Sequence, residues 1–278
     1  MICAYRFDGR GGGTRLGWKD IPADAEANGT WVHLDLQQEH ARRWIASESG
    51  LSPIVAEALL DEETRPRCTV INDGLLVNLR GVNLNPGSDA EDMVSIRIYI
   101  DKDRIVTTRR RRLMAVQAIQ ERIDAGNGPR NGTEFLIELA DQLLDRMGPV
   151  IADLDDDVDA IEDRVLTETR AALRGELWQL RRQAILLRRY VAPQREAMAK
   201  LTTEPISWID LQAAQRLREI ADRVTRYVED LDSARERAAI VQDELASRLG
   251  EQMNRNMYIL SVIAGIFLPL SLITGLLG

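Results

Sequence analysis

Seven carboxylates crowd one short stretch of the chain and are the first feature that suggests chemistry. The stretch is "DLDDDVDAIED", residues 153–163, and its carboxylates are Asp153, Asp155, Asp156, Asp157, Asp159, Glu162 and Asp163. Oxygen ligands suit hard divalent cations, and rings of acidic side chains raise the local cation concentration. The stretch therefore indicates a surface that gathers divalent cations, although a solvated helix face explains the same pattern.

The remaining ligand types do not support a zinc enzyme. A tetrahedral zinc site takes three or four His, Cys or carboxylate ligands at short spacing. The chain has two histidines, His33 and His40, and no cysteine lies near them. His33 alternates with Trp31 and Asp35 along an expected strand, which favours a structural role.

Phosphate binding and covalent catalysis are also unsupported. The glycine-rich "GRGGGTR", residues 9–15, lacks the Lys-Ser/Thr pair and the strand-to-helix context of a phosphate-binding loop, so it predicts a flexible turn. No nucleophile lies in an evident arrangement with a base. We therefore expect a protein that is not an enzyme and that binds no cofactor tightly.

A basic cluster, Arg109, Arg110, Arg111 and Arg112, ends a predicted strand. It can pair with carboxylates such as those of 153–163, bind an anion, or stay solvated, and the sequence leaves its role open. The formal net charge of −8 argues against nucleic acid as the main partner. Two cysteines, Cys3 and Cys68, make no disulfide framework, which fits a reducing cytoplasm.

The last 22 residues, Met257 to Gly278, carry no charge. At about 1.5 Å per residue, a helix of this length spans the hydrocarbon core of a bilayer. Tyr258 stands where an interfacial aromatic is expected, and Arg248 and Arg255 precede the segment. By the positive-inside rule, the preceding domain lies on the cytoplasmic side.

Small and polar residues recur within this segment at alternating steps of three and four, which places them on one helix face. They are Asn254, Met257, Ser261, Ala264, Leu268, Ser271 and Gly275. Such a stripe indicates helix–helix packing or a pore wall. Because Pro269 cannot donate a hydrogen bond to the carbonyl of Gly265, we expect a kink or a local widening near 265–269.

A long helix leads into the span. No Gly or Pro occurs between Ile206 and Leu249, and apolar or small residues repeat there with a period of 3.5, the pattern of a helix packed along its length. The repeating positions are Leu217, Ile220, Val224, Tyr227, Leu231, Ala234, Ala238, Val241 and Leu245. The pattern predicts one helix from about residue 206 to residue 278.

The first part of the chain alternates strand-like and helix-like segments. Strands are expected at 30–36, 75–82, 93–100 and 104–110, with a helix at 38–49 and another at 52–64 capped by Ser52. Further helices are expected at 113–125, 133–167 and 170–203, the last broken near Pro193.

The fold class is therefore α+β: an N-terminal α/β domain with a mixed sheet, helical hairpins, and one very long stalk helix that continues into a transmembrane span. The expected domains are 1–130 (the α/β cytoplasmic domain), 131–205 (the helical hairpins), 206–256 (the stalk) and 257–278 (the first span).

These elements, together with several local motifs, resemble the CorA superfamily of divalent metal transporters, and most closely its ZntB branch. The matching pieces are "WVHLDL" (31–36), "DEETRPR" (61–67), "RRQAILLRRYVAPQRE" (181–196) and "FLPLSLITGLLG" (267–278). They spread over nearly the whole chain, and "TRPR" and "RRYVAPQR" are the pieces most specific to that branch.

The resemblance implies a homopentamer in the bacterial inner membrane, with a cytoplasmic funnel and a pore lined by the stripe. Gly278 joins the stripe as the first residue of the family's Gly-x-Asn signature, and the rest of that signature and a second span lie beyond the given sequence. The implied cargo is Zn²⁺, with Mg²⁺, Co²⁺, Ni²⁺ and Cd²⁺ as further candidates. The direction of transport and any proton coupling are left open.

Three alternatives stay open. One is a magnesium or cobalt channel of the CorA type, which Met directly after Gly278 would favour. Another is a tail-anchored protein that oligomerises through the heptads and transports nothing. The third is a soluble sensor whose acidic helix binds a regulatory metal.

Overall fold

The structure is a computed structural model, and it describes residues 2–21, 29–62, 65–167, 171–204 and 206–277. The chain forms two compact units. The first unit comprises Met1–Asp153 and Ile185–Asp232, and the second comprises Leu154–Ala184 and Ser233–Gly278. Each of the three long helices has one part in the first unit and the other part in the second unit.

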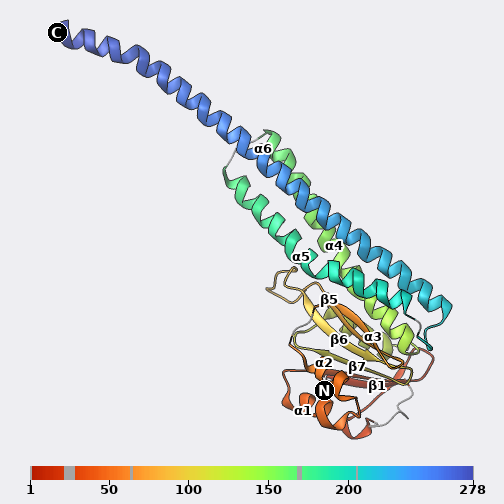
Figure 1. The fold of residues 1–278 in the computed structure, drawn as a ribbon. Coiled ribbons are helices and arrows are strands. Elements are labelled where there is room, and N and C mark those ends of the chain that lie inside the picture. Colours follow the sequence, from red (N-terminus) through yellow and green to blue (C-terminus); the bar gives the residue numbers. More distant parts are fainter. Residues whose placement is uncertain (1, 22–28, 63–64, 168–170, 205, 278) are drawn as a thin grey trace. The chain divides into compact units, whose positions relative to one another are not determined.

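A seven-stranded mixed sheet forms the centre of the first unit (Figure 1), with the order β2-β1-β3-β7-β6-β5-β4. Only β3 and β7 pair in parallel among the described strands, and the other neighbours are antiparallel. The strands are β1 (Cys3–Phe7), β2 (Gly13–Arg15), β3 (Thr30–Asp35), β4 (Arg67–Ile71), β5 (Gly74–Gly81), β6 (Val94–Ile100) and β7 (Arg104–Arg109).

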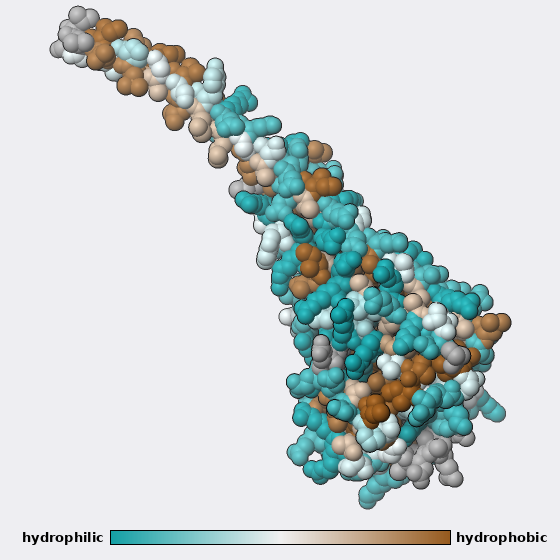
Figure 2. Space-filling view, viewed as in Figure 1, coloured by the Kyte–Doolittle hydropathy of each residue, from teal (hydrophilic) through white to brown (hydrophobic). Residues whose placement is uncertain are grey.

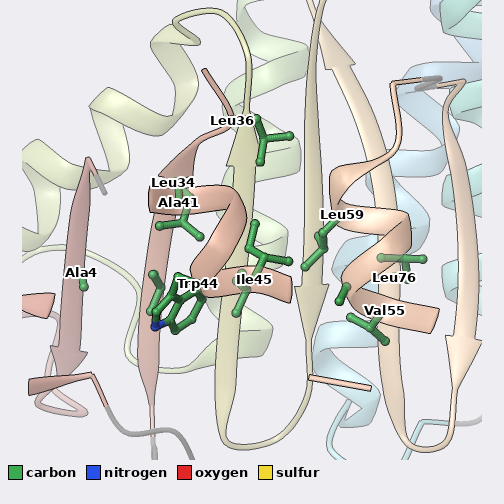
Figure 3. Packing of buried hydrophobic residues seen from close by; sticks show 12 residues of the cluster. Ala4, Leu34, Leu36, Ala41, Trp44, Ile45, Val55, Leu59 and Leu76 are labelled. Carbon is green, nitrogen blue, oxygen red and sulfur yellow. The ribbon is translucent and has the colours of Figure 1, made fainter. Parts of the chain in front are cut away.

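Alternation along the strands divides the buried side chains between the two faces of the sheet. On one face, Val32, Leu34 and Val106 form an apolar core with the short helices that cross it (Figure 3). On the other face, Trp31 packs against Phe135 with a ring-centroid separation of 4.7 Å. The short elements are η1 (Trp18–Asp20), α1 (Glu39–Arg43), the π-helical turn η2 (Trp44–Glu48) and α2 (Pro53–Leu60).

The four predicted strands are confirmed as β3, β5, β6 and β7, but three strands were missed. The prediction of a turn at residues 9–15 was wrong in part, because Gly13–Arg15 forms β2 and pairs with β1. The turn itself is held by Asp8, whose carboxylate accepts hydrogen bonds from the backbone N–H of Arg10 (2.7 Å) and of Gly12 (3.0 Å). A sequence pattern of period two cannot identify a three-residue strand.

The remaining helices are α3 (Met114–Asp124), α4 (Gly132–Thr167), α5 (Ala171–Thr203) and α6 (Leu211–Leu277). The predicted break near Pro193 was wrong, because α5 continues through this residue. A proline removes one helical hydrogen bond, and the buried side chains of Val191, Ala197 and Met198 on both sides of it keep the helix packed.

The long helix α6 begins at Leu211, five residues later than predicted. Asp210 caps its N-terminus, because its carboxylate accepts a hydrogen bond from the backbone N–H of Ala213 at 2.7 Å. The residues before it dock on the β4–β5 turn, where Ser207 donates its hydroxyl and its backbone N–H to Asp73. This docking replaces the first predicted turn of the helix.

The predicted heptads of α6 are confirmed as its buried face. Leu217, Val224 and Leu231 are fully buried in the first unit. In the second unit, where α6 packs with parts of α4 and α5, the buried positions continue as Ala234, Ala238, Val241 and Leu245. Tyr227 is half-buried, and the adjacent Val228 takes the buried place in that turn.

Candidate functional site

The C-terminal part of α6 is the one segment of the described chain that is long and apolar enough to cross a membrane, judged by length and composition. None of this apolar window is buried within the chain. Figure 2 shows this uncovered surface, with hydrophobic residues gathered on the C-terminal end of α6. Soluble proteins rarely leave so much contiguous apolar surface uncovered, so the segment needs another environment.

The described helix runs without interruption through Gly265 and Pro269. At about 100° per residue, the seven stripe residues from Asn254 to Gly275 share an arc of about 100°. Ile259, Ile263, Ile266, Leu270 and Ile273 lie on the opposite side. All stripe residues are exposed within a single chain. Gly278 lies outside the described residues, and the expected kink stays a prediction.

The stripe extends toward the N-terminus on a face that the sequence analysis missed. The same steps of three and four lead from Asn254 to Gly250, Ser247, Asp243, Ile240, Glu236 and Ser233. These side chains are exposed, except that Gly250 is half-buried. They stand opposite the buried heptad positions, so α6 packs with its own chain on one face and leaves the stripe side free. The signal was the same spacing, masked by the stronger apolar heptads.

The acidic stretch lies on α4, and two of its carboxylates are already engaged. Arg237 of α6 forms ion pairs with Asp155 and Asp159. The other five, namely Asp153, Asp156, Asp157, Glu162 and Asp163, are exposed. The predicted cluster therefore has two parts. Asp155 and Asp159 link α4 to α6 through Arg237, and the other five carboxylates form an acidic surface. Its role in gathering cations stays a prediction.

The basic cluster at the end of β7 pairs with carboxylates of the first unit. Arg110 forms an ion pair with Glu62 at 2.9 Å, and Arg111 pairs with Asp92. Arg112 donates to the amide oxygen of Gln117. Arg109 is half-buried, and burial lowers its pKa below the ordinary arginine value. Two of the four arginines thus pair with carboxylates, but with Glu62 and Asp92 and not with those of 153–163.

His33 is structural, as expected. Its ring is fully buried, and Nδ1 lies 2.8 Å from the hydroxyl of Thr107. Burial lowers the pKa of His33 to about 3, with a smaller contribution from the charge of Arg109. The residues that the structure describes contain no group of three or more His, Cys, Asp or Glu arranged to hold a metal ion.

Comparison with known proteins identifies the relatives of this chain. A family model described as CorA-like Mg²⁺ transporter protein matches residues 26–278. The divalent cation transporter CmaX of Pseudomonas aeruginosa is 40% identical and is covered over 85% of its length by the whole of this chain. The zinc transport protein ZntB of Yersinia enterocolitica is 36% identical and is covered over 84% of its length.

Solved structures of CmaX and of a ZntB cytoplasmic domain also resemble this chain. The structure of the full-length CmaX protein superposes with a TM-score of 0.93 at 41% identity, covering all of this chain and 86% of that one. The ZntB cytoplasmic domain of Vibrio parahaemolyticus gives a TM-score of 0.80 at 19% identity, covering 90% of this chain and 98% of that domain. At this identity the second match supports the fold, α+β with a mixed sheet and a long C-terminal helix.

Proposed function

Because the chain belongs to the family of CorA-like Mg²⁺ transporter proteins, we propose that it transports divalent cations, zinc foremost, across the bacterial inner membrane. The observation that carries the proposal is the uninterrupted helix α6, which is packed on one face and leaves an apolar span with a small and polar stripe uncovered. Relatives of the chain are named as a divalent cation transporter and as a zinc transport protein.

In the proposed mechanism, five copies assemble so that their stripes line one axial path. A divalent cation keeps most of its water there, because Ser261, Ser271 and backbone groups offer only weak neutral partners. Met257 and Leu268 narrow the path with apolar side chains. A hydrophobic constriction of this kind can gate by losing its water.

Carboxylates on the cytoplasmic side would concentrate cations ahead of this path. Asp243 and Glu236 stand in line with the stripe on the exposed face of α6, so a ring of copies presents them toward the same axis. The exposed carboxylates of α4 that lie in the second unit, Asp156, Asp157, Glu162 and Asp163, add to its negative potential. No tightly bound cofactor is part of this mechanism.

The orientation follows from basic residues near the span. Arg255 is exposed directly before the apolar segment. Arg248 lies about two turns further from it and pairs with Glu244 at 2.6 Å. Arginines beside a span favour the cytoplasmic side, which supports a cytoplasmic location for the first unit.

Uptake of metal into liposomes that contain the protein tests this function. We expect Zn²⁺ to enter faster than in protein-free liposomes and faster than Mg²⁺ or Co²⁺. Faster uptake of Mg²⁺ would favour a second candidate function, a magnesium channel. The description of the matching family model, CorA-like Mg²⁺ transporter protein, supports this candidate. Uptake of no divalent cation would contradict the proposed transport altogether.

A further inference from the structure

The second unit carries exposed charges of opposite sign on two of its helices. Asp156 and Asp163 are exposed on α4, while Arg174 and Arg182 are exposed on α5. None of these four side chains forms an ion pair with another residue in the described part of the chain. We call the surface with Asp156 and Asp163 the acidic flank of α4, and the surface with Arg174 and Arg182 the basic flank of α5. Neither flank has its charge compensated by an ion pair within the described part of the chain.

The acidic flank of α4 faces neither of the other two helices. Asp155 and Asp159 mark the side that faces α6, because both pair with Arg237. Arg164 marks the side that faces α5, because it pairs with Glu176 at 2.7 Å. At about 100° per residue, Asp156 and Asp163 lie about 40–60° beyond Asp159, away from both neighbours.

The basic flank of α5 is arranged in the same way. Arg181 marks the side that faces α6, since it donates to Gln242 at 3.4 Å. Trp178 and Arg182 lie about 60–100° beyond Arg181, and Arg174 lies between. This flank points away from Glu176 and therefore from α4.

Large apolar side chains are exposed beside these charges. Trp178 on the basic flank is 58% exposed. Leu166 is 59% exposed and, at about 100° per residue, lies between Asp155 and Asp159 on the α6 side of the acidic flank. Apolar anchors within a charged surround are typical of protein interfaces. Because α4 and α5 run antiparallel with Arg164 beside Glu176, Asp163 and Leu166 stand level with Arg174 and Trp178.

We propose that a second copy of this chain docks on these flanks, with the acidic flank of α4 in one copy against the basic flank of α5 in the next. The two flanks differ, so the contact is heterologous, and such a contact forms a ring when its rotation closes. Complementary charge fixes the register of such a contact. The inference rests on the proposed function, because the ring is what would bring the α6 stripes together.

Cysteine cross-linking tests the contact directly. One version of the protein carries Asp163→Cys, a second carries Trp178→Cys, and the two are co-expressed with different tags and oxidised in membranes. We expect covalent dimers that contain both tags, and none when either version is expressed alone. Cross-links within the Asp163→Cys version alone would show a two-fold contact and overturn the proposal. Cys3 and Cys68 are buried and do not compete.

Charge reversal supplies the second arm. The pair Asp156→Arg and Asp163→Arg should convert the oligomer to monomers by light scattering in detergent, and adding Arg174→Asp and Arg182→Asp should restore it. The matched control is Asp153→Arg with Asp157→Arg, which reverses two exposed carboxylates on the side of α4 that Arg164 marks, outside the acidic flank, and should leave the mass unchanged.

The outcomes separate the two proposals. If the unaltered protein is itself a monomer, the pore and the contact fail together. If it is an oligomer that survives the reversal and gives no mixed cross-link, the contact alone is overturned. Reduced metal uptake at unchanged mass would likewise overturn it and assign these carboxylates to gathering cations.

Discussion

At the residue scale, the clearest group is His33, whose buried ring bonds to Thr107 and nothing else among the described residues. Its pKa falls from 6.5 to about 3, chiefly because burial disfavours the charged ring. The unfolded chain therefore takes up a proton near pH 6.5 that the folded chain refuses. Stability from His33 is complete above that pH and is lost as the pH falls toward 3.

This sign gives a measurable slope. When the pH is lowered from 8 to 5, the free energy of unfolding should fall by about 2 kcal/mol, because the unfolded chain protonates His33 and the folded chain does not. Replacing His33 with Gln should remove that part of the pH dependence. Urea unfolding of both forms at the two pH values measures it, and equal slopes would show that the ring is accessible to protons.

The thiols give a second prediction at this scale. Burial raises the pKa of Cys3 to about 11 and that of Cys68 to about 12. At pH 8 both are neutral thiols, which are poor nucleophiles. A thiol-reactive dye should label neither in the folded protein and both after unfolding, whereas a Leu211→Cys version, with its cysteine at a position that is 81% exposed, should label at once. Rapid labelling of the unaltered protein would contradict the buried placement.

At the element scale, α6 shows how far sequence pattern reaches. Its heptads, its length and its apolar end were all predictable, because each repeats over many turns. Its start at Leu211 was not, because the cap from Asp210 and the docking of Ser207 on Asp73 depend on a turn far away in the sequence. The exposed face with Asp243 was missed for a related reason: its meaning comes from what the opposite face packs against.

The buried face of α6 can be tested by truncation. Leu217 is fully buried and Leu211 is 81% exposed, and both lie in the first unit. Leu217→Ala should lower the free energy of unfolding by about 3 kcal/mol, because it leaves a cavity. The same change at Leu211 should cost less than about 0.5 kcal/mol. Urea unfolding compares them, and similar losses would contradict the assignment of the packed face.

At the scale of the whole molecule, the short strands and the partners of the charges lay beyond sequence reasoning. β1, β2 and β4 are defined by their neighbours in the sheet, and Arg237 meets Asp155 and Asp159 across a separation of about 80 residues. The class of protein was nevertheless predictable, because the stripe of the span and the motifs of the first unit point to one family. Assembly into five copies is the property of the whole molecule on which the proposed pore depends.

The central claim is that one face of α6 lines the path of the metal, and a matched pair of substitutions tests it most directly. Leu268→Trp places a bulky ring on the stripe, and Ile263→Trp places the same ring on the opposite side. Zinc uptake into liposomes should fall to the protein-free background for Leu268→Trp and stay near the unaltered rate for Ile263→Trp. Unchanged uptake by Leu268→Trp, in protein of unchanged oligomeric mass, would contradict the claim.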